Sequence, residues 1–181
     1  MAHYFVNDDK DKRRYEYIFE FGGRIFRFAT SDGVFSKGSV DEGTKWLLTA
    51  VLPKIREGGT VADIGCGYGV LGIVITAFVN GVQCFMSDIN IKAVELANIN
   101  ASLNGVSEKA AAVVGDGLSV INEKVDYVVT NPPFRAGKQV VLRFFEEGYK
   151  ALKDKGIFFA VLRKQQGADS YIKSVDNIFG N

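Results

Sequence analysis

Four consecutive residues, Asn-Pro-Pro-Phe at 131–134, bring together groups that could act on one substrate atom. The two prolines stiffen the backbone and remove two N–H donors, which leaves the Asn131 side-chain oxygen and the Pro132 carbonyl as neighbouring acceptors. Two adjacent acceptors match the two hydrogens of a planar NH₂ group, and holding both can turn the nitrogen lone pair toward an electrophile. Phe134 could stack on a flat substrate. The motif predicts chemistry on an amino nitrogen, and a rigid Pro-Pro turn is the alternative.

A glycine-rich segment, Asp-Ile-Gly-Cys-Gly-Tyr-Gly at 63–69, joins a predicted strand to a predicted helix. A G-x-G-x-x-G pattern also starts here, at Gly67, Gly69 and Gly72, and alone it weakly indicates a dinucleotide site. Asp63 argues against that reading, because a carboxylate aimed into the loop would repel a pyrophosphate. A ligand with a cationic end and no phosphate fits better, and S-adenosylmethionine is such a ligand. The glycines let the backbone approach it closely.

Two further acids follow predicted strands. Asp88 lies roughly 20 residues beyond the glycine loop, where nucleoside-binding α/β folds place an acid that accepts hydrogen bonds from ribose hydroxyls. Asp116, within Val-Gly-Asp-Gly at 114–117, could accept from an adenine amino group. The ordinary alternatives are a solvated strand-end residue or a helix cap for Asp88, and an Asp-Gly turn for Asp116.

Composition excludes several classes of function. The chain has 22 Lys and Arg against 21 Asp and Glu, so net charge alone would not hold it on nucleic acid. Two cysteines and one histidine, His3, are too few for a Cys/His zinc site, a Ser-His-Asp triad or an H-E-x-x-H site. We therefore expect no metal. The longest apolar stretch, 70–79, is too short to span a bilayer, and no signal peptide opens the chain, so we expect a cytoplasmic protein with no membrane contact.

The surrounding pattern predicts the elements that position these residues. Residues 1–14 are polar and predict a mobile tail, and residues 15–181 predict one domain. Alternation on both sides of Gly22-Gly23 predicts a β-hairpin at 15–30, and residues 41–52 predict a helix. From residue 60 to the end, short apolar runs alternate with helical segments, which predicts an α/β, Rossmann-like core: a mostly parallel sheet with helices on both faces. The strands are expected at 61–64, 82–87, 110–114, 125–130 and 157–162, and the helices at 69–79, 90–103, 138–152 and 168–179.

Together these motifs resemble the class I S-adenosylmethionine-dependent methyltransferases, and Asn-Pro-Pro-Phe resembles the subset that methylates amino nitrogens. Further segments are similar to the RsmC-like family, which methylates guanine N2 in small-subunit ribosomal RNA. They are 33–36, Asp41 and Gly43 before a Leu-Leu pair, 63–69, 130–137 and 164–167.

The resemblance implies a role for each matching residue. The methionine part of the cofactor would lie on Asp63, Gly65, Gly67 and Gly69, the ribose on Asp88, and the adenine on Asp116. Ile89, Gly117 and Asn131 are also expected at the cofactor. Asn131, Pro132 and Phe134 would hold the target base and do the catalytic work, with Phe35, Pro133, Arg135 and Lys138 as substrate-binding residues. Arg135, Lys138 and Arg143 could neutralise phosphates beside a flipped base, or be ordinary solvated charges.

The chain departs from the family pattern in two ways. Larger members carry a second, degenerate methyltransferase-like half, where this sequence has only the hairpin. The fold normally ends with an antiparallel strand pair, whereas this sequence stops at residue 181 after the last predicted helix. The predicted strand at 157–162 would then be an exposed sheet edge.

We therefore expect an S-adenosylmethionine-dependent enzyme, favoured as a monomer, that acts on ribosomal RNA or the small ribosomal subunit at guanine N2. The same amino chemistry would suit adenine N6 or a protein glutamine amide. A non-catalytic nucleotide-binding module is the alternative from another class.

Overall fold

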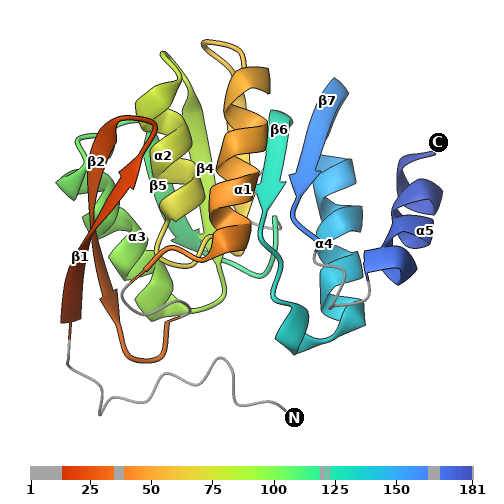
Figure 1. The fold of residues 1–181 in the computed structure, drawn as a ribbon. Coiled ribbons are helices and arrows are strands. Elements are labelled where there is room, and N and C mark those ends of the chain that lie inside the picture. Colours follow the sequence, from red (N-terminus) through yellow and green to blue (C-terminus); the bar gives the residue numbers. More distant parts are fainter. Residues whose placement is uncertain (1–13, 35–38, 119–120, 122, 163–167, 181) are drawn as a thin grey trace.

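The computed structural model describes residues 14–34, 39–118, 121, 123–162 and 168–180 (Figure 1). Within them, one parallel sheet has the strand order β5-β4-β3-β6-β7. Its strands are β3 (Thr60–Ile64), β4 (Gln83–Asp88), β5 (Ala110–Val114), β6 (Val125–Thr130) and β7 (Leu152–Ala160). The order reverses at β3, because the chain moves outward to β4 and β5 and then returns to β6 on the other side of β3. Ligands of open α/β sheets bind at this kind of reversal, beyond the carboxyl ends of the strands.

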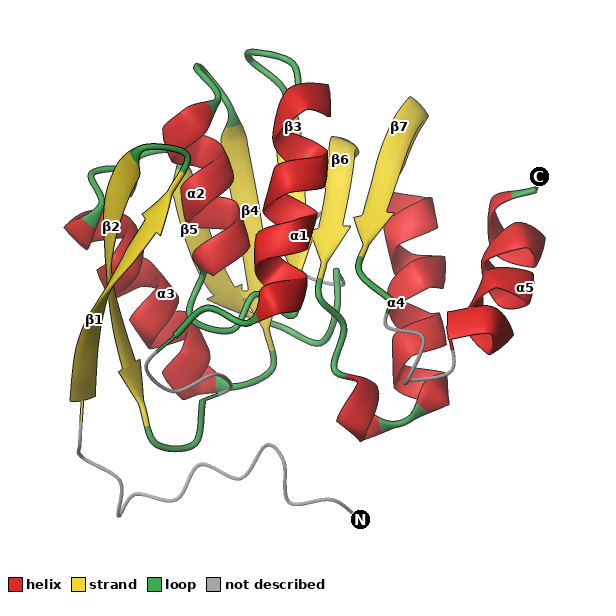
Figure 2. Cartoon of the chain, in the orientation of Figure 1, coloured by secondary structure: helices red, strands yellow, loops and turns green. Residues whose placement is uncertain are grey.

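Helices cover both faces of the sheet, as the sequence predicts (Figure 2). They are α1 (Glu42–Val51), α2 (Val70–Phe78), α3 (Ile91–Leu103), α4 (Lys138–Ala151) and α5 (Ala168–Phe179), with short 3₁₀ turns η1 (Leu52–Lys54) and η2 (Phe134–Ala136). Strand β3 shows how the faces divide. Val61 joins a cluster with side chains of α1, α2 and α3, whereas Ala62 and Ile64 join one that includes Phe144 of α4. Asp63 shares the face of Val61, because side chains alternate along a strand.

The predicted hairpin is confirmed as β1 (Arg14–Phe21) and β2 (Arg24–Ser31), paired antiparallel through the Gly22-Gly23 turn. Its inner face contributes Phe19, Phe26 and Phe28 to the cluster that also contains side chains of α2 and α3. Asn100 of α3 fixes its position: the side-chain amide accepts from Ala29 N at 2.7 Å and donates to Ala29 O at 2.9 Å. The predicted tail at 1–14 lies outside the described residues except for Arg14, which begins β1.

Strand β7 begins earlier than predicted, directly after α4 and not at residue 157. Leu152 pairs with Val125, and Ile157 pairs with Tyr127. Between these two pairs the chain advances five residues along β7 but only two along β6, so the register shifts there. Lys155 takes up this excess with a φ of 63°. The polar segment 153–156 reads as a loop in the sequence, but the chain pairs on both sides of it.

Candidate active site

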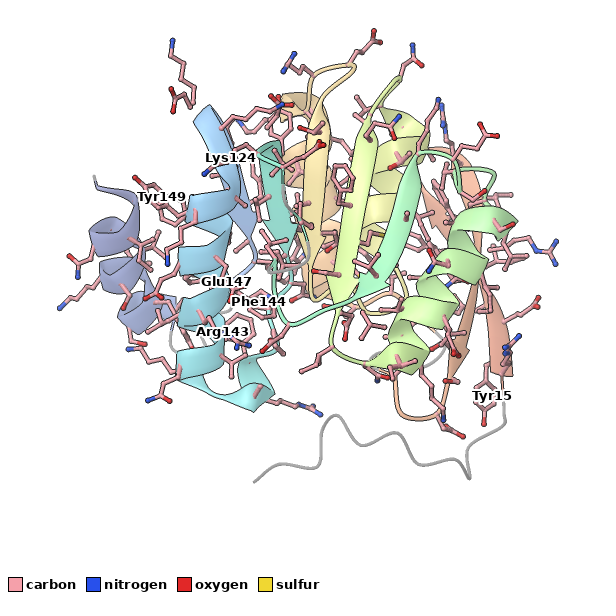
Figure 3. All side chains as sticks on the ribbon, turned by 180° about the vertical axis from the view of Figure 1, so that it is seen from behind. Tyr15, Lys124, Arg143, Phe144, Glu147 and Tyr149 are labelled. Atoms are coloured by element: carbon pink, nitrogen blue, oxygen red, sulfur yellow. The ribbon has the colours of Figure 1, made fainter. Side chains whose placement is uncertain are left out.

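A pocket of about 320 Å³ lies where β3, β4 and β6 end. Its wall combines the glycine loop, the segments that follow β4, β5 and β6, the first turn of α1, and one face of α4. Figure 3 shows Arg143, Phe144 and Glu147 extending from α4 toward the sheet, and the first two of these line the pocket. The predicted motifs, which are far apart in the sequence, therefore meet in one place.

Asp63 is the most deeply buried acid of the pocket, with 1% of its surface exposed. Its Oδ2 accepts from Gly72 N at 3.0 Å, at the start of α2. Its Oδ1 is buried without a hydrogen-bond partner in the described part of the chain. Burial, with a smaller contribution from the nearby Asp88, raises the pKa of Asp63 to about 7, although the Gly72 hydrogen bond opposes the rise. A cationic group in the pocket would give this carboxylate the missing partner.

The glycine loop needs left-handed backbone at three positions: φ is 66° at Gly65, 56° at Gly67 and 91° at Gly69. Residues other than glycine rarely adopt such values. A Cβ on Gly67 would meet no atom within 4 Å, so the conformation, and not crowding, requires glycine there. Gly67 N donates to Asp88 Oδ2 at 2.9 Å, which ties the loop to the end of β4.

The second carboxylate oxygen of Asp88 accepts a hydrogen bond from the start of α3. Oδ1 accepts from Asn90 N at 2.8 Å, and Asn90 is the N-cap of α3. Burial raises the pKa of Asp88, although the hydrogen bonds from Asn90 and Gly67 oppose this. Ile89, which lies between Asp88 and Asn90 in the sequence, is 45% exposed and lines the pocket. It therefore offers an apolar surface beside the Asp88 carboxylate.

Asp116 lies on the pocket wall but is already engaged. Its two oxygens accept from the two terminal nitrogens of Arg143, with 2.7 Å between Nη1 and Oδ2. An adenine amino group would therefore share this carboxylate with Arg143, which is possible because a carboxylate offers about four acceptor positions. Gly117 has a φ of 67°, and a Cβ there would lie 1.7 Å from Oε2 of Glu147, so a larger residue would both strain the backbone and displace this carboxylate.

The Asn-Pro-Pro-Phe segment leaves the end of β6 in a fixed shape. Phe134 N donates to Pro132 O at 2.9 Å, and Pro133 has φ −77° and ψ 78°, the geometry of an inverse γ-turn. The Pro132 carbonyl thus keeps one of its two lone pairs for another donor. The Asn131 amide nitrogen donates to Asp41 and Thr44, at the start of α1.

The predicted substrate-binding residues are only partly brought together. Pro133, Phe134 and Arg135 line the pocket. Phe134 is half-buried, and its ring meets Tyr171 of α5 edge-on, with 5.8 Å between centroids. Lys138 is not part of the wall: its ammonium lies over the Tyr171 ring at 5.6 Å and donates to Ser170 O at 3.4 Å.

Two predictions fall on residues that the structure does not describe. Phe35 and the family-like segment 164–167 lie outside the described residues. The residues on either side of 35–38 do reach the site: Gly33, Val34 and Val40 line the pocket.

Sequence reasoning missed several contributors. Thr44 carries no motif of its own, and the pairing of Arg143 with Asp116 joins α4 to the loop after β5. Tyr68 of the glycine loop meets Tyr17 of the hairpin, with 2.7 Å between their hydroxyl oxygens. Burial, together with Tyr68, raises the pKa of Tyr17, so this phenol stays protonated. The aromatic residue within the glycine loop was the only available signal for this contact.

Within the described ranges, no three His, Cys, Asp or Glu side chains gather as a metal site would require. None of the described helices is both long enough and apolar enough to cross a bilayer.

Two relatives are similar to this chain over much of its length. The Bacillus subtilis protein YbxB is 34% identical, over 98% of this chain and 89% of its own length. Ribosomal RNA small subunit methyltransferase C of Hahella chejuensis is 37% identical, over 70% of this chain but only 37% of its own length. The chain thus spans nearly all of the first relative and about a third of the second.

A solved structure has the same fold. The Thermus thermophilus 16S rRNA N2 G1207 methyltransferase RsmC, in complex with AdoMet and guanosine, superposes with a TM-score of 0.80 at 24% identity. The match covers 92% of this chain and 46% of that one. The model of the methyltransferase small domain matches residues 25–181. The resemblance drawn from the motifs is thereby confirmed, and the chain belongs to the methyltransferase small domain family.

Proposed function

We propose that this methyltransferase uses S-adenosylmethionine to methylate an exocyclic amino nitrogen, and that its target is guanine N2 in small-subunit ribosomal RNA. The observation that carries the proposal is the pair of acceptors at the end of β6. The Asn131 amide nitrogen is turned away toward Asp41 and Thr44, and one lone pair of the Pro132 carbonyl remains available. Asn131 and Pro132 line the same pocket as Asp63, whose Oδ1 is buried without a partner in the described chain.

The pocket's donor set fits the cofactor. Asp63 would take the ammonium group, because its Oδ1 is buried and lacks a partner in the described chain. Asp88 would accept from the ribose hydroxyls through the lone pairs that Gly67 and Asn90 leave. Ile89 would pack on the adenine, and Asp116 would accept from its amino group while still paired with Arg143. When bound, S-adenosylmethionine supplies an electrophilic methyl group.

Catalysis then consists of orientation and electrostatics. Asn131 Oδ1 and Pro132 O hold the two hydrogens of the target NH₂, so its lone pair points out of the base plane. As the nitrogen gains positive charge, both hydrogen bonds strengthen, which lowers the barrier more than it stabilises bound substrate. The proton leaves late, to water, so no histidine base is needed. Phe134 would stack on the base, with Tyr171 supporting its ring.

Guanine N2 is favoured over the other amino targets by the relatives. The methyltransferase C proteins act on small-subunit ribosomal RNA by name, and the RsmC structure contains guanosine. An enzyme acting on ribosomal RNA in a bacterium would work in the cytoplasm.

The test is transfer of labelled methyl from S-adenosylmethionine to purified 30S subunits and to free rRNA, followed by nucleoside analysis. We expect N2-methylguanosine with the wild-type chain and a strongly reduced amount with Asn131→Ala. Label found in N6-methyladenosine or in protein would show that the target is adenine N6 or a protein amide and not guanine N2. Cofactor binding without transfer to any substrate would favour a non-catalytic module.

A further inference from the structure

The amide of Asn131 has a polar environment that the Asn-Pro-Pro-Phe motif does not supply. Its nitrogen lies 3.2 Å and 3.1 Å from the two carboxylate oxygens of Asp41, and 3.0 Å from Thr44 Oγ1. Both partners come from the start of α1, 90 and 87 residues earlier in the chain. No hydrogen bond to Asn131 Oδ1 is found among the described residues, and Asn131 lines the pocket.

These contacts decide which way the amide faces. A carboxylate only accepts hydrogen bonds, so the group turned toward Asp41 has to be the NH₂. The opposite orientation would place Oδ1 against two carboxylate oxygens and leave the NH₂ toward the pocket. A substrate amino group would then meet donors and not an acceptor. The orientation of Asn131 is therefore set by the charge of its neighbour and not by the motif itself.

Asp41 is itself held in place by the helix that it begins. It is the N-cap of α1, and its Oδ1 accepts from Gly43 N at 3.0 Å and from Thr44 N at 3.4 Å. Thr44 Oγ1 donates to Asp41 Oδ2 at 2.5 Å, so this hydroxyl presents its lone pairs to Asn131. The amide, the hydroxyl and the carboxylate thus form a closed network between α1 and the end of β6.

We propose that Asp41 is a positioning residue, which acts through Asn131 by fixing its amide so that Oδ1 faces the substrate amino group. Thr44 supports it by accepting the second amide hydrogen. This inference rests on the proposed amino-methyl transfer, because the orientation of Asn131 matters only if its oxygen accepts from substrate.

The test substitution is Asp41→Asn, which is nearly isosteric and keeps an N-cap of equal quality. The new side chain has one acceptor oxygen where Asp41 has two. If that oxygen caps α1, the amide NH₂ of the new side chain faces the Asn131 NH₂, and a donor cannot hold a donor. We expect kcat for methyl transfer to fall about tenfold to a hundredfold, as for the loss of a hydrogen bond to a charged group. The KM for RNA and the affinity for S-adenosylmethionine should change less than about threefold, since the substrate and cofactor contacts remain.

Glu42→Gln is the matched control. It removes one negative charge from the same helix turn, but Glu42 is exposed and pairs with Lys45 on the outer surface. We expect wild-type kcat from this variant. A drop equal to that of Asp41→Asn would mean that any lost charge at the start of α1 slows transfer, and the proposal would be overturned.

A double-mutant cycle isolates action through Asn131. In an Asn131→Ala background, single-turnover rates should change less than about twofold when Asp41→Asn is added, because the group that Asp41 positions is gone. The same fold loss in both backgrounds would show that Asp41 acts independently of Asn131, contrary to the proposal.

The orientation can also be read without activity. In ¹⁵N-labelled protein, the side-chain NH₂ of Asn131 should exchange slowly with solvent in the wild type and quickly in Asp41→Asn. Fast exchange in the wild type would overturn the positioning role, whatever the substrate. Slow exchange in a chain that methylates no amino group would support the orientation and instead reject the proposed function.

Discussion

At the scale of single residues, the site depends on polar atoms that the fold leaves incompletely paired. Asp63 Oδ1 is buried without a partner in the described chain, and its pKa is raised to about 7. Asn131 Oδ1 and the second lone pair of Pro132 O are available at the pocket. Buried polar groups normally have hydrogen-bond partners. Several such atoms without partners in one pocket therefore indicate that a bound ligand supplies the missing hydrogen bonds.

Cofactor binding should depend on the ionisation of Asp63. The carboxylate must be charged to bind an ammonium group, so wild-type affinity for S-adenosylmethionine should rise between pH 6 and pH 8. Asp63→Asn should bind about tenfold to a hundredfold more weakly at pH 8 and lose that part of the pH dependence. Titration calorimetry at several pH values measures both, and identical pH profiles for the two proteins would contradict the role of Asp63.

The same group should affect the unliganded fold. Its pKa lies above the ordinary value for an unfolded Asp, so the unfolded chain releases this proton first as pH rises. Stability should therefore fall from about pH 4 to about pH 7, and Asp63→Asn should make that decline smaller, leaving the part that comes from Asp88, whose pKa burial also raises. The titratable neighbours Cys66 and Cys84 do not interfere, because burial raises the pKa of both thiols.

Asn131 and Phe134 should separate in kinetics. Asn131→Ala should lower kcat by about 10² to 10³ and leave cofactor affinity nearly unchanged, by analogy with the loss of one oxyanion-hole donor. Phe134→Ala should mainly raise the apparent KM for RNA, because the loss of a stacking surface weakens the free energy of RNA binding by roughly 1–3 kcal/mol. Steady-state kinetics on 30S subunits checks both. Near-wild-type turnover by Asn131→Ala would reduce the motif to a rigid turn.

At the scale of elements, one buried asparagine binds the hairpin to the core by hydrogen bonds, in addition to the packing of its Phe side chains. Asn100 is fully buried and also donates to Tyr68 O at 2.9 Å, so it connects β2 with the glycine loop. Asn104, one turn later, makes the corresponding pair of bonds to the Arg27 backbone near the surface. The two residues offer the same chemistry at different burial.

Replacing each with alanine should therefore have unequal effects. Asn100→Ala leaves several buried backbone groups unpaired and should cost about 2–4 kcal/mol of unfolding free energy. Asn104→Ala should cost about 1 kcal/mol or less, because water can replace its bonds. Urea unfolding measures the difference, and hydrogen exchange should show hairpin amides opening in the first variant. Equal costs would mean that this asparagine does not hold the hairpin.

The loop after β5 is positioned by α4. Leu118 N donates to Glu147 Oε2 at 2.9 Å, in the space that a side chain on Gly117 would occupy. Gly105 has nearly the same φ, 69° against 67°, but a Cβ there would meet no atom within 4 Å. Alanine at residue 105 should cost about 1–2 kcal/mol from conformation alone. Alanine at residue 117 should cost more and also weaken cofactor binding by displacing Asp116. Equal unfolding midpoints would contradict this account of the loop.

At the scale of the whole molecule, local sequence patterns predict the helices and strands but not the side-chain contacts between them. The strands β3, β5 and β6 and the helices α2 and α3 match their predicted ranges to within a residue or two, because their apolar periodicity is strong. The start of β7 was missed, because Leu152 is placed by pairing with Val125 and no local signal marks it. The strand ends gather most of the predicted site residues, as their positions in a parallel sheet require, whereas Lys138 lies off the pocket wall and Phe35 lies outside the described residues.

The contacts that orient the site were not predictable in the same way. The pairing of Asn131 with Asp41 joins residues 90 apart, and that of Arg143 with Asp116 joins residues 27 apart. Neither follows from propensity or spacing, because both depend on how α1 and α4 pack on the sheet. The sequence thus predicts which groups would do the chemistry, and the fold determines which way their side chains point.

The most direct test of the central claim is nucleoside mass spectrometry of small-subunit rRNA from cells lacking the gene, complemented with the wild-type chain or with Asn131→Ala. The account predicts that N2-methylguanosine falls on deletion, returns with the wild type, and returns poorly with the variant. An unchanged N2-methylguanosine content on deletion, or equal restoration by both chains, would contradict it.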